Sequence, residues 1–381
     1  MISRASLFPR LALLLITGVL VSTLVKNPVS RVDLKICLDA AQHLLHSQTV
    51  YDISVPLEHT KPPLGTLLFI PLSLLPFTLM SWLWNVFIIG SALLSAWLLA
   101  RDLNKKDARS IALYGLLFCL AQLNVELNVG QYNVIALLLI VIARQTPSLV
   151  TGMIGVILLL LKPTNILFIP WIVKNKKSPS LHSMIAGGGL ALVGLTTTYL
   201  ILFGWDHFIQ SHIQWLHFLP ISTAKHIANP DNLGIPGVLS FLGSQSWFNN
   251  GLLLLGLGLT IAICATVTHS VLQLGLCGLL YLWISPMTWP QNFCLVLPAI
   301  LWALQETRES RPHKRWIIAS LSVFYLGSQI LNYTFLGKET FLILREFRPL
   351  FWTSVVAAGL GVNYWQISYG YKASTKRPNT Q

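Results

Sequence analysis

The chain contains 381 residues, of which 54% are hydrophobic and 10% are charged, and it carries a formal net charge of +13. This composition excludes an ordinary soluble domain and predicts a multi-span membrane protein with one integral domain over residues 1–381. The basic residues form short clusters between apolar segments, which is typical of membrane orientation signals and argues against nucleic acid as a partner. The five cysteines show no CxxC spacing, so we expect neither a disulfide framework nor a metal site.

The first apolar run, at 11–25, lacks a small-x-small cleavage site, which favours a retained first span. Short loops rich in lysine and arginine stay in the cytoplasm. We therefore expect the following segments there: the N-terminus, 101–109, Arg144, 174–177, 308–315 and the tail 368–381. The remaining breaks are expected outside: 27–63, 127–133, 162–165, 204–249, 285–292 and 336–348. This alternation predicts about twelve crossings, some shorter than the about 20 residues that span a bilayer, with both termini in the cytoplasm.

The first external segment, 27–63, carries apolar residues at helical spacing. These are Leu34, Cys37, Leu38, Ala41, Leu44 and Leu45. The spacing predicts an amphipathic helix that lies along the membrane and is opened by Asp33. Two roles are open for Asp33: it caps this helix, or its carboxylate is a general base at the water interface.

Residues 64–100 hold two apolar helical patterns where the charge pattern permits only one crossing. The first pattern, 64–77, contains Pro71 and Pro76. We therefore expect it to be re-entrant or interfacial, and we expect the second pattern to cross the membrane.

The sequence LLKPTN at 160–165 interrupts a long hydrophobic run. Because Arg144 and the cluster at 174–177 are both basic, the segment between them should cross the membrane and return, with 162–165 as its outer turn. Pro163 falls where a helix must end. Lys162 then either extends to the lipid headgroups or directs its charge at an anion held between helices.

The second long external segment, 204–249, is rich in histidine and aromatic residues. Its histidines lack the HxxxH or HExxH spacing of a zinc site, and its aromatic residues are typical of an interfacial belt. External carboxylates are few and form no D-x-D pair, so we expect a metal-independent activity without a cofactor.

Several motifs follow one another on the side expected to be external. D-L-x-x-x-x-x-A-A-x-x-L-L at 33–45, Y-D at 51–52 and the Pro-rich stretch at 62–77 resemble the opening of glycosyltransferase family 87, the polyprenol-phosphate-mannose-dependent mannosyltransferases. Further similar motifs are G-Q-x-N at 130–133, L-K-P-T at 161–164, F-G-x-D at 203–206, an N-x-x-L-x-G-like stretch at 229–237 and S-P-x-[ST]-W at 285–289. The resemblance extends over nearly the whole chain.

The resemblance implies an all-α polytopic C-type glycosyltransferase fold with amphipathic helices in the first external loop. Such an enzyme transfers a hexose, here expected to be mannose, from polyprenyl phosphate to an acceptor hydroxyl group on the extracytoplasmic face of the cell membrane, with inversion. Asp33 would be the catalytic base and Lys162 a phosphate or sugar contact. The remaining expected substrate contacts are Gln131, Asn133, Asn232, Lys61, Gln291, Asn292 and Trp289, the last as a platform for a sugar ring or the prenyl chain.

The chain departs from the family pattern after Trp289, where histidine is common in the family and this sequence has Pro-Gln-Asn. Either Gln291 and Asn292 act as neutral donors to the phosphate, or His226 or Lys225 has taken over. The acceptor is open between a glycolipid, a polysaccharide or other glycan, and a protein. Two other classes are a lipid-linked sugar transporter or flippase, which usually shows repeated halves that are not seen here, and a non-catalytic membrane partner.

Overall fold

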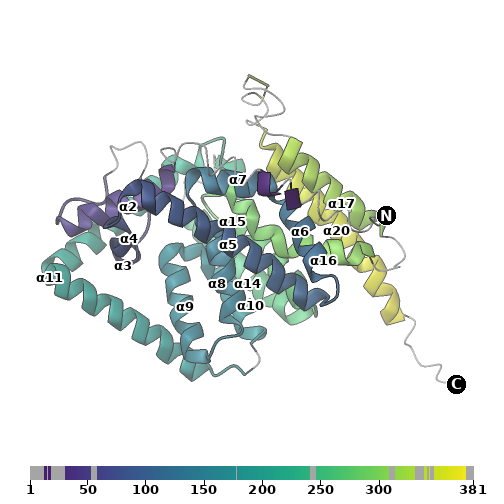
Figure 1. The fold of residues 1–381 in the computed structure, drawn as a ribbon, viewed down its shortest axis with the longest axis horizontal. Helices are drawn as coiled ribbons and strands as arrows, with labels where there is room; N and C mark the ends of the chain where they lie inside the picture. Colours follow the sequence, from purple (N-terminus) through teal and green to yellow (C-terminus); the bar gives the residue numbers. More distant parts are fainter. Residues whose placement is uncertain are drawn as a thin grey trace.

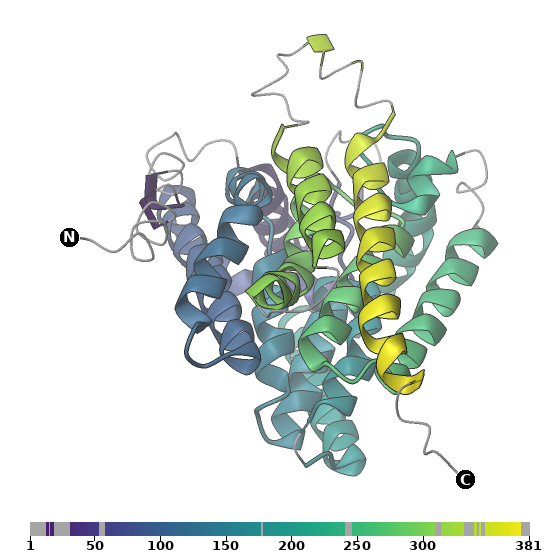
Figure 2. The same ribbon diagram turned by 90° about the vertical axis from the view of Figure 1, so that its right-hand side faces the viewer.

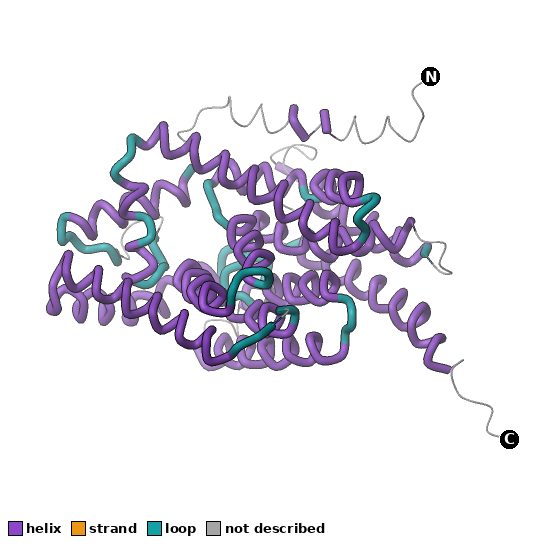
Figure 3. The backbone as a smooth tube through the Cα atoms, turned by 60° about the horizontal axis from the view of Figure 1, so that its bottom comes forward, coloured by secondary structure: helices purple, strands orange, loops and turns teal. Residues whose placement is uncertain are grey.

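The computed structural model describes residues 31–52, 58–176, 178–240, 246–308, 314–330 and 347–374, and short pieces at 13–14, 16–18, 339–340 and 343. Helices joined by loops make up these residues, with no strand among them (Figures 1 and 3). The expected all-helical class is therefore confirmed. The expected first span at 11–25 and the break at 336–348 lie mostly outside the described residues.

Three described helices are long and apolar enough to cross a membrane: α5 (Phe77–Leu103), α11 (Leu181–Ile227) and α14 (Ser246–Thr266). The pair α6 (Ala108–Phe118) and α7 (Leu120–Val129) forms a fourth candidate that is bent by 65°. Shorter apolar helices are α8 (Asn133–Ala143), α9 (Ser148–Leu161) and α15 (Ser270–Ile284). The chain is thus a helical membrane protein, and the twelve crossings stay a prediction.

The other elements are short or lie around this set. They are α2 (Val32–Leu45), α3 (Pro63–Leu67), α4 (Ile70–Ser73), η2 (Pro163–Phe168), α10 (Ile169–Lys174), α12 (Ile235–Val238), η3 (Pro290–Val296), α16 (Leu297–Arg308), α17 (Arg315–Tyr325), η4 (Leu326–Ile330) and α20 (Pro349–Ser374). Helices α17 and α20 lie side by side on one flank of the molecule (Figure 2). Helices α5, α6, α8, α15 and α16 contribute most of the apolar core.

The segment 64–77, which we expected to be re-entrant or interfacial, is not one continuous helix, and its placement in the membrane stays a prediction. It forms two short helices, α3 and α4, before the long α5 begins at Phe77. Pro71 lies in the first turn of α4, and Pro76 is the N-cap of α5. Proline lacks the N–H that a continuing helix needs, which explains why each helix begins anew at these positions.

Helix α11 is bent at Gly204, whose φ of 80° and ψ of 171° are not helical. Its two arms form a V, and the second arm runs toward α3 (Figure 1). The hydroxyl of Tyr199 lies 2.7 Å from Oγ of Ser211 and 3.0 Å from Nδ1 of His207, so this side chain ties the two arms together. Because α11 extends to Ile227, the first part of the expected external segment 204–249 is helical.

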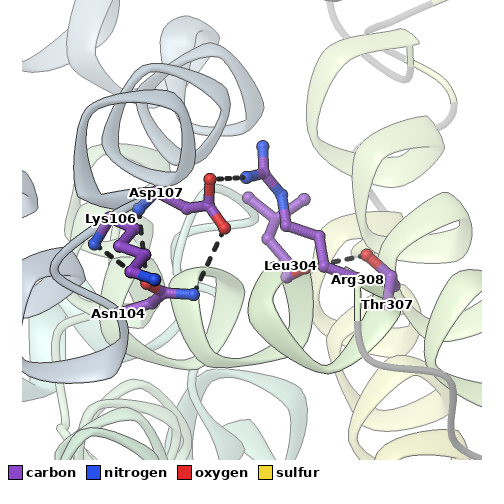
Figure 4. A network of polar contacts seen from close by, with 6 residues as sticks. All are labelled: Asn104, Lys106, Asp107, Leu304, Thr307 and Arg308. Atoms are coloured by element: carbon purple, nitrogen blue, oxygen red, sulfur yellow. Dashed lines mark hydrogen bonds and ion pairs between the residues drawn. The ribbon is translucent and has the colours of Figure 1, made fainter.

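The basic breaks of the sequence gather at one end of the fold. Arg144 forms an ion pair with Asp102, and Nη1 of Arg308 lies 3.4 Å from Oδ1 of Asp107 (Figure 4). The ammonium group of Lys176 donates to Oγ1 of Thr151 at 2.8 Å. The segments around 102–107, 144–151, 176 and 308 are thus neighbours, and the side of the membrane that they face stays a prediction.

Candidate functional site

Gln131 lies in the turn between α7 and α8, and contacts of the neighbouring Gly130 fix the backbone of this turn. Gly130 ends α7 in the left-handed conformation, with φ of 76°, and a Cβ atom there would lie only 2.7 Å from Cβ of Leu34 on α2. Glycine is the residue that tolerates both this φ and this close approach. Nε1 of Trp84 donates to the Gly130 carbonyl at 2.9 Å. The turn is therefore held against the first turn of α2.

Asp33 lies at this contact. Helix α2 begins at Val32, so Arg31 is the N-cap residue and Asp33 stands in the first turn, with no side-chain cap hydrogen bond. The alternative that Asp33 caps the helix is therefore wrong. Its carboxylate instead accepts a hydrogen bond from Nε2 of Gln131. The predicted base and one predicted sugar contact, 98 residues apart in sequence, are thus direct neighbours.

The charges of two lysines act on this carboxylate: Lys61 lies in the loop before α3, and Lys162 follows the end of α9. Nζ of Lys61 lies 5.1 Å from the ring centre of Tyr132, and Nζ of Lys162 lies 5.2 Å from the ring centre of Tyr281. Burial raises the pKa of Asp33, while the Gln131 hydrogen bond and the charges of Lys61 and Lys162 act in the opposite direction. We call Asp33, Gln131, Lys61 and Lys162 the acid–lysine cluster.

The position of Lys162 follows from the proline after it. Helix α9 ends at Leu161, and Lys162 is extended, with φ of −159° and ψ of 114°. A residue before proline is disfavoured in the helical region, so the predicted break is confirmed and has a local cause. Nζ of Lys162 lies 3.4 Å from the carbonyl oxygen of Met287, so the side chain points toward the loop at 285–289.

Asn232 fixes the conformation of that loop. Its Nδ2 donates to the Pro286 carbonyl at 2.7 Å, and its Oδ1 accepts from the backbone N–H of Thr288 at 3.0 Å. The side chain is fully buried. Asn232 therefore holds together two segments that resemble family motifs, and both of these hydrogen bonds are to the protein backbone.

Asn133 is also engaged within the protein. Its Nδ2 donates to Oε2 of Glu126 at 3.2 Å, and the backbone N–H of Val134 donates to Oε1 at 2.9 Å. Glu126 is fully buried, so its carboxylate satisfies the open N-terminus of α8. Asn133 thus lies near Gln131 in sequence but outside the acid–lysine cluster.

Trp289, Gln291 and Asn292 follow the loop at 285–289. The backbone N–H of Trp289 donates to Oδ1 of Asn292 at 3.2 Å, whereas Nδ2 of Asn292 is buried without a partner among the described residues. Gln291 is 6% exposed, and Trp289 is partly exposed. A buried amide donor without a partner is uncommon and indicates an acceptor that the described residues do not supply.

A buried ion pair next to Trp289 was not predicted. The Glu58 side chain is 0% exposed, and its carboxylate lies 2.5 Å from Nζ of Lys225 and 3.7 Å from Nε2 of His226. The His226 and Trp289 ring centres are 6.0 Å apart. The sequence singled out His226 and Lys225 as alternatives near the site, but Glu58 was only one of several external acids. The one feature of the sequence that could have pointed to Glu58 is its position three residues before the Lys-Pro-Pro that leads into α3.

The described residues contain no group of three His, Cys, Asp or Glu side chains placed to hold a metal ion. Comparison with known proteins gives one match. The family model for glycosyltransferase family 87 matches residues 59–286, more than half of the chain. That range includes three members of the acid–lysine cluster, begins after Asp33 and ends before Trp289. No curated protein and no solved structure matches the chain.

Proposed function

Because the chain belongs to glycosyltransferase family 87, we propose that it transfers a hexose from polyprenyl phosphate to an acceptor hydroxyl group, with Asp33 as the general base. Mannose is the expected sugar. The observation that carries this proposal is the acid–lysine cluster, in which Gln131 bonds one partly buried carboxylate and the charges of two lysines act on it. A carboxylate and separate cations are what an inverting transfer from a phosphate needs.

In the proposed reaction the acceptor oxygen attacks the anomeric carbon as its proton passes to the Asp33 carboxylate. The bond from that carbon to the phosphate oxygen breaks, and polyprenyl phosphate leaves with the electron pair. Negative charge therefore grows on the phosphate, and Lys162 and Lys61 oppose it. Burial raises the pKa of Asp33, which makes the ionised group a stronger base. The lysines counteract this rise and help to keep the group ionised.

The remaining residues have proposed supporting roles. Trp289 offers a surface for the sugar ring or the prenyl chain, and Nδ2 of Asn292, which has no partner among the described residues, supports a hydrogen bond to substrate there. Gln291 is a second neutral donor in the same segment. Lys225, which is 45% exposed and is held by Glu58, supplies a further cation beside His226 and Trp289.

We also propose that the acid–lysine cluster faces the extracytoplasmic side of the cell membrane. The acid–lysine cluster is built from residues 33, 61, 131 and 162. The basic segments around 102–107, 144 and 308 contact one another and contribute no residue to this cluster. With the basic end in the cytoplasm, the alternation gives about twelve crossings and two cytoplasmic termini, as in a C-type glycosyltransferase. The acceptor is a glycolipid or another glycan, and no metal or cofactor is part of the proposed reaction.

The purified chain in liposomes tests this function. Given a polyprenyl-phosphate hexose with a labelled sugar and a membrane glycolipid extract as acceptor, it should move the label onto a new lipid and release polyprenyl phosphate. Mannose should serve better than glucose. If the labelled donor instead crosses the bilayer intact and no label is transferred, the chain is a flippase and the proposal is wrong.

A further inference from the structure

A group of buried polar side chains lies beside the start of α2, outside the acid–lysine cluster. Arg31 is 3% exposed, and Ser81 and Asn85, one helical turn apart on α5, are each 0% exposed. Nε of Arg31 donates to Oδ1 of Asn85 at 3.1 Å. This hydrogen bond holds the guanidinium group against α5 and leaves its other nitrogens available.

Three atoms of this group lack a hydrogen-bond partner within the part of the chain that the structure describes. They are Nη1 of Arg31, Oγ of Ser81 and Nδ2 of Asn85. The arginine and asparagine nitrogens can only donate, and the serine hydroxyl can donate as well. Buried polar atoms in proteins are normally paired, so three free donors on neighbouring side chains indicate a missing acceptor.

Arg31 also forms no ion pair with any acid of the described residues. Its guanidinium group stays protonated in proteins, and burial lowers its pKa. The first 30 residues contain no Asp or Glu, and the closest acid in sequence, Asp33, interacts with Gln131 and the two lysines. A buried charge without a counterion is costly, which an anion at this position would relieve.

Lys176, another buried cation of the described residues, shows the contrast. It is 7% exposed, and its ammonium group donates to Oγ1 of Thr151 at 2.8 Å and to the Thr146 carbonyl. Its donors are therefore satisfied by the protein. Burial alone does not explain the free donors around Arg31.

We propose that Arg31, Ser81 and Asn85 bind one phosphate group of a lipid. A guanidinium group matches the spacing of phosphate oxygens and favours them over neutral acceptors. The same turns of α5 expose apolar side chains on their other face, among them Leu79 at 48% and Val86 at 61%, so a lipid chain has an apolar surface nearby. Two lipids carry this chemistry: the polyprenyl-phosphate donor and a membrane phospholipid.

The site adjoins the proposed reaction centre. A Cβ atom on Gly130 would lie 3.3 Å from Cβ of Arg31, and the next residue, Gln131, bonds Asp33. The proposal rests on the proposed function, because the proposed donor is a lipid phosphate that must bind close to Asp33. Phosphate binding can nevertheless be measured without sugar transfer.

Native mass spectrometry of the full chain from phosphatidylcholine nanodiscs tests the site with two added lipids, a polyprenyl monophosphate and phosphatidylglycerol. We expect Arg31→Gln to bind one of them about tenfold more weakly than the wild type, because a charge-assisted hydrogen bond is lost. If Arg31→Gln weakens binding of polyprenyl monophosphate, the ligand is the donor lipid. If it weakens binding of phosphatidylglycerol, the ligand is a membrane phospholipid. Arg31→Lys should bind with intermediate affinity, and Lys176→Gln should bind as the wild type does.

Asn85→Ala and Ser81→Ala serve as second variants, because they leave the charge in place and keep the test decisive if Arg31→Gln does not fold. Each should weaken binding of the same lipid by about threefold. Unchanged affinity of Asn85→Ala and the arginine variants for both lipids would overturn the site. The assay is independent of turnover: a wild type without transferase activity refutes the proposed function, and the binding result still decides the phosphate site.

Discussion

Replacing Gly130 with alanine tests whether the contact between α2 and the α7–α8 turn positions the reactive groups. The new Cβ atom would lie 2.7 Å from Cβ of Leu34, whereas carbon atoms in contact stay about 3.5–4.0 Å apart. Helix α2 and the turn must therefore separate by roughly 1 Å, taking Asp33 away from Gln131. Alanine at φ of 76° adds a backbone cost of about 1–2 kcal/mol.

A misplacement of this size is expected to lower turnover by about a hundredfold. The assay is initial-rate transfer of labelled hexose in liposomes, with the amount of folded protein measured in parallel. Gly189→Ala on α11 is the matched control, because a Cβ atom there meets nothing within 4 Å. That variant should keep full turnover and gain slightly in stability.

A Gly130→Ala protein with wild-type turnover would show that the spacing of α2 and the turn is irrelevant to the reaction. Lower turnover that is matched by an equal loss of folded protein would likewise contradict the positioning role, because the effect would then be one of stability alone.

Three further outcomes are expected, for Lys162, for the Glu58 ion pair and for the membrane topology. Lys162→Met removes a charge that lowers the pKa of Asp33, so the acid limb of the kcat–pH profile should move to higher pH, and an unmoved limb contradicts their coupling. Glu58→Gln should lower the unfolding free energy by about 1–2 kcal/mol, which is less than for a fully buried pair because Lys225 is 45% exposed. Denaturant unfolding measures this free energy. An unchanged value would show that the ion pair is dispensable for stability. Reporter fusions at residues 105 and 163 should lie on opposite sides of the membrane, and the proposed topology fails if both report the same side.

Local breaks in the helices could be predicted because single residue types cause them. Proline after Lys162 ends α9, and glycine at 130 supplies the left-handed turn at the end of α7. Charge distribution along the chain also indicated that the segments of Asp33, Gln131 and Lys162 share one side. The direct contact of the first two confirms that they are neighbours.

Partner choice between distant segments could not be predicted. Glu58 is an unremarkable acid in the sequence, and only the packing of its loop against the end of α11 pairs it with Lys225. Asn133 and Asn232 are expected sugar contacts from their motifs, which stays a prediction, and the sequence did not reveal that their amides also bond Glu126 and the Pro286 carbonyl. A motif gives the residue type and the approximate place, whereas the direction of a side chain depends on tertiary packing.

The measurement that tests the central claim most directly is hexose transfer by Asp33→Asn compared with Asp39→Asn. Both acids lie on α2, but Asp39 is exposed and paired with Lys35 at 2.5 Å, so its replacement controls for loss of a helical carboxylate. Asp33→Asn should bind polyprenyl-phosphate hexose like the wild type and lose transfer by about 10²-fold or more, while Asp39→Asn retains it. Transfer at the wild-type rate by the Asp33→Asn protein would contradict the proposal that Asp33 is the base.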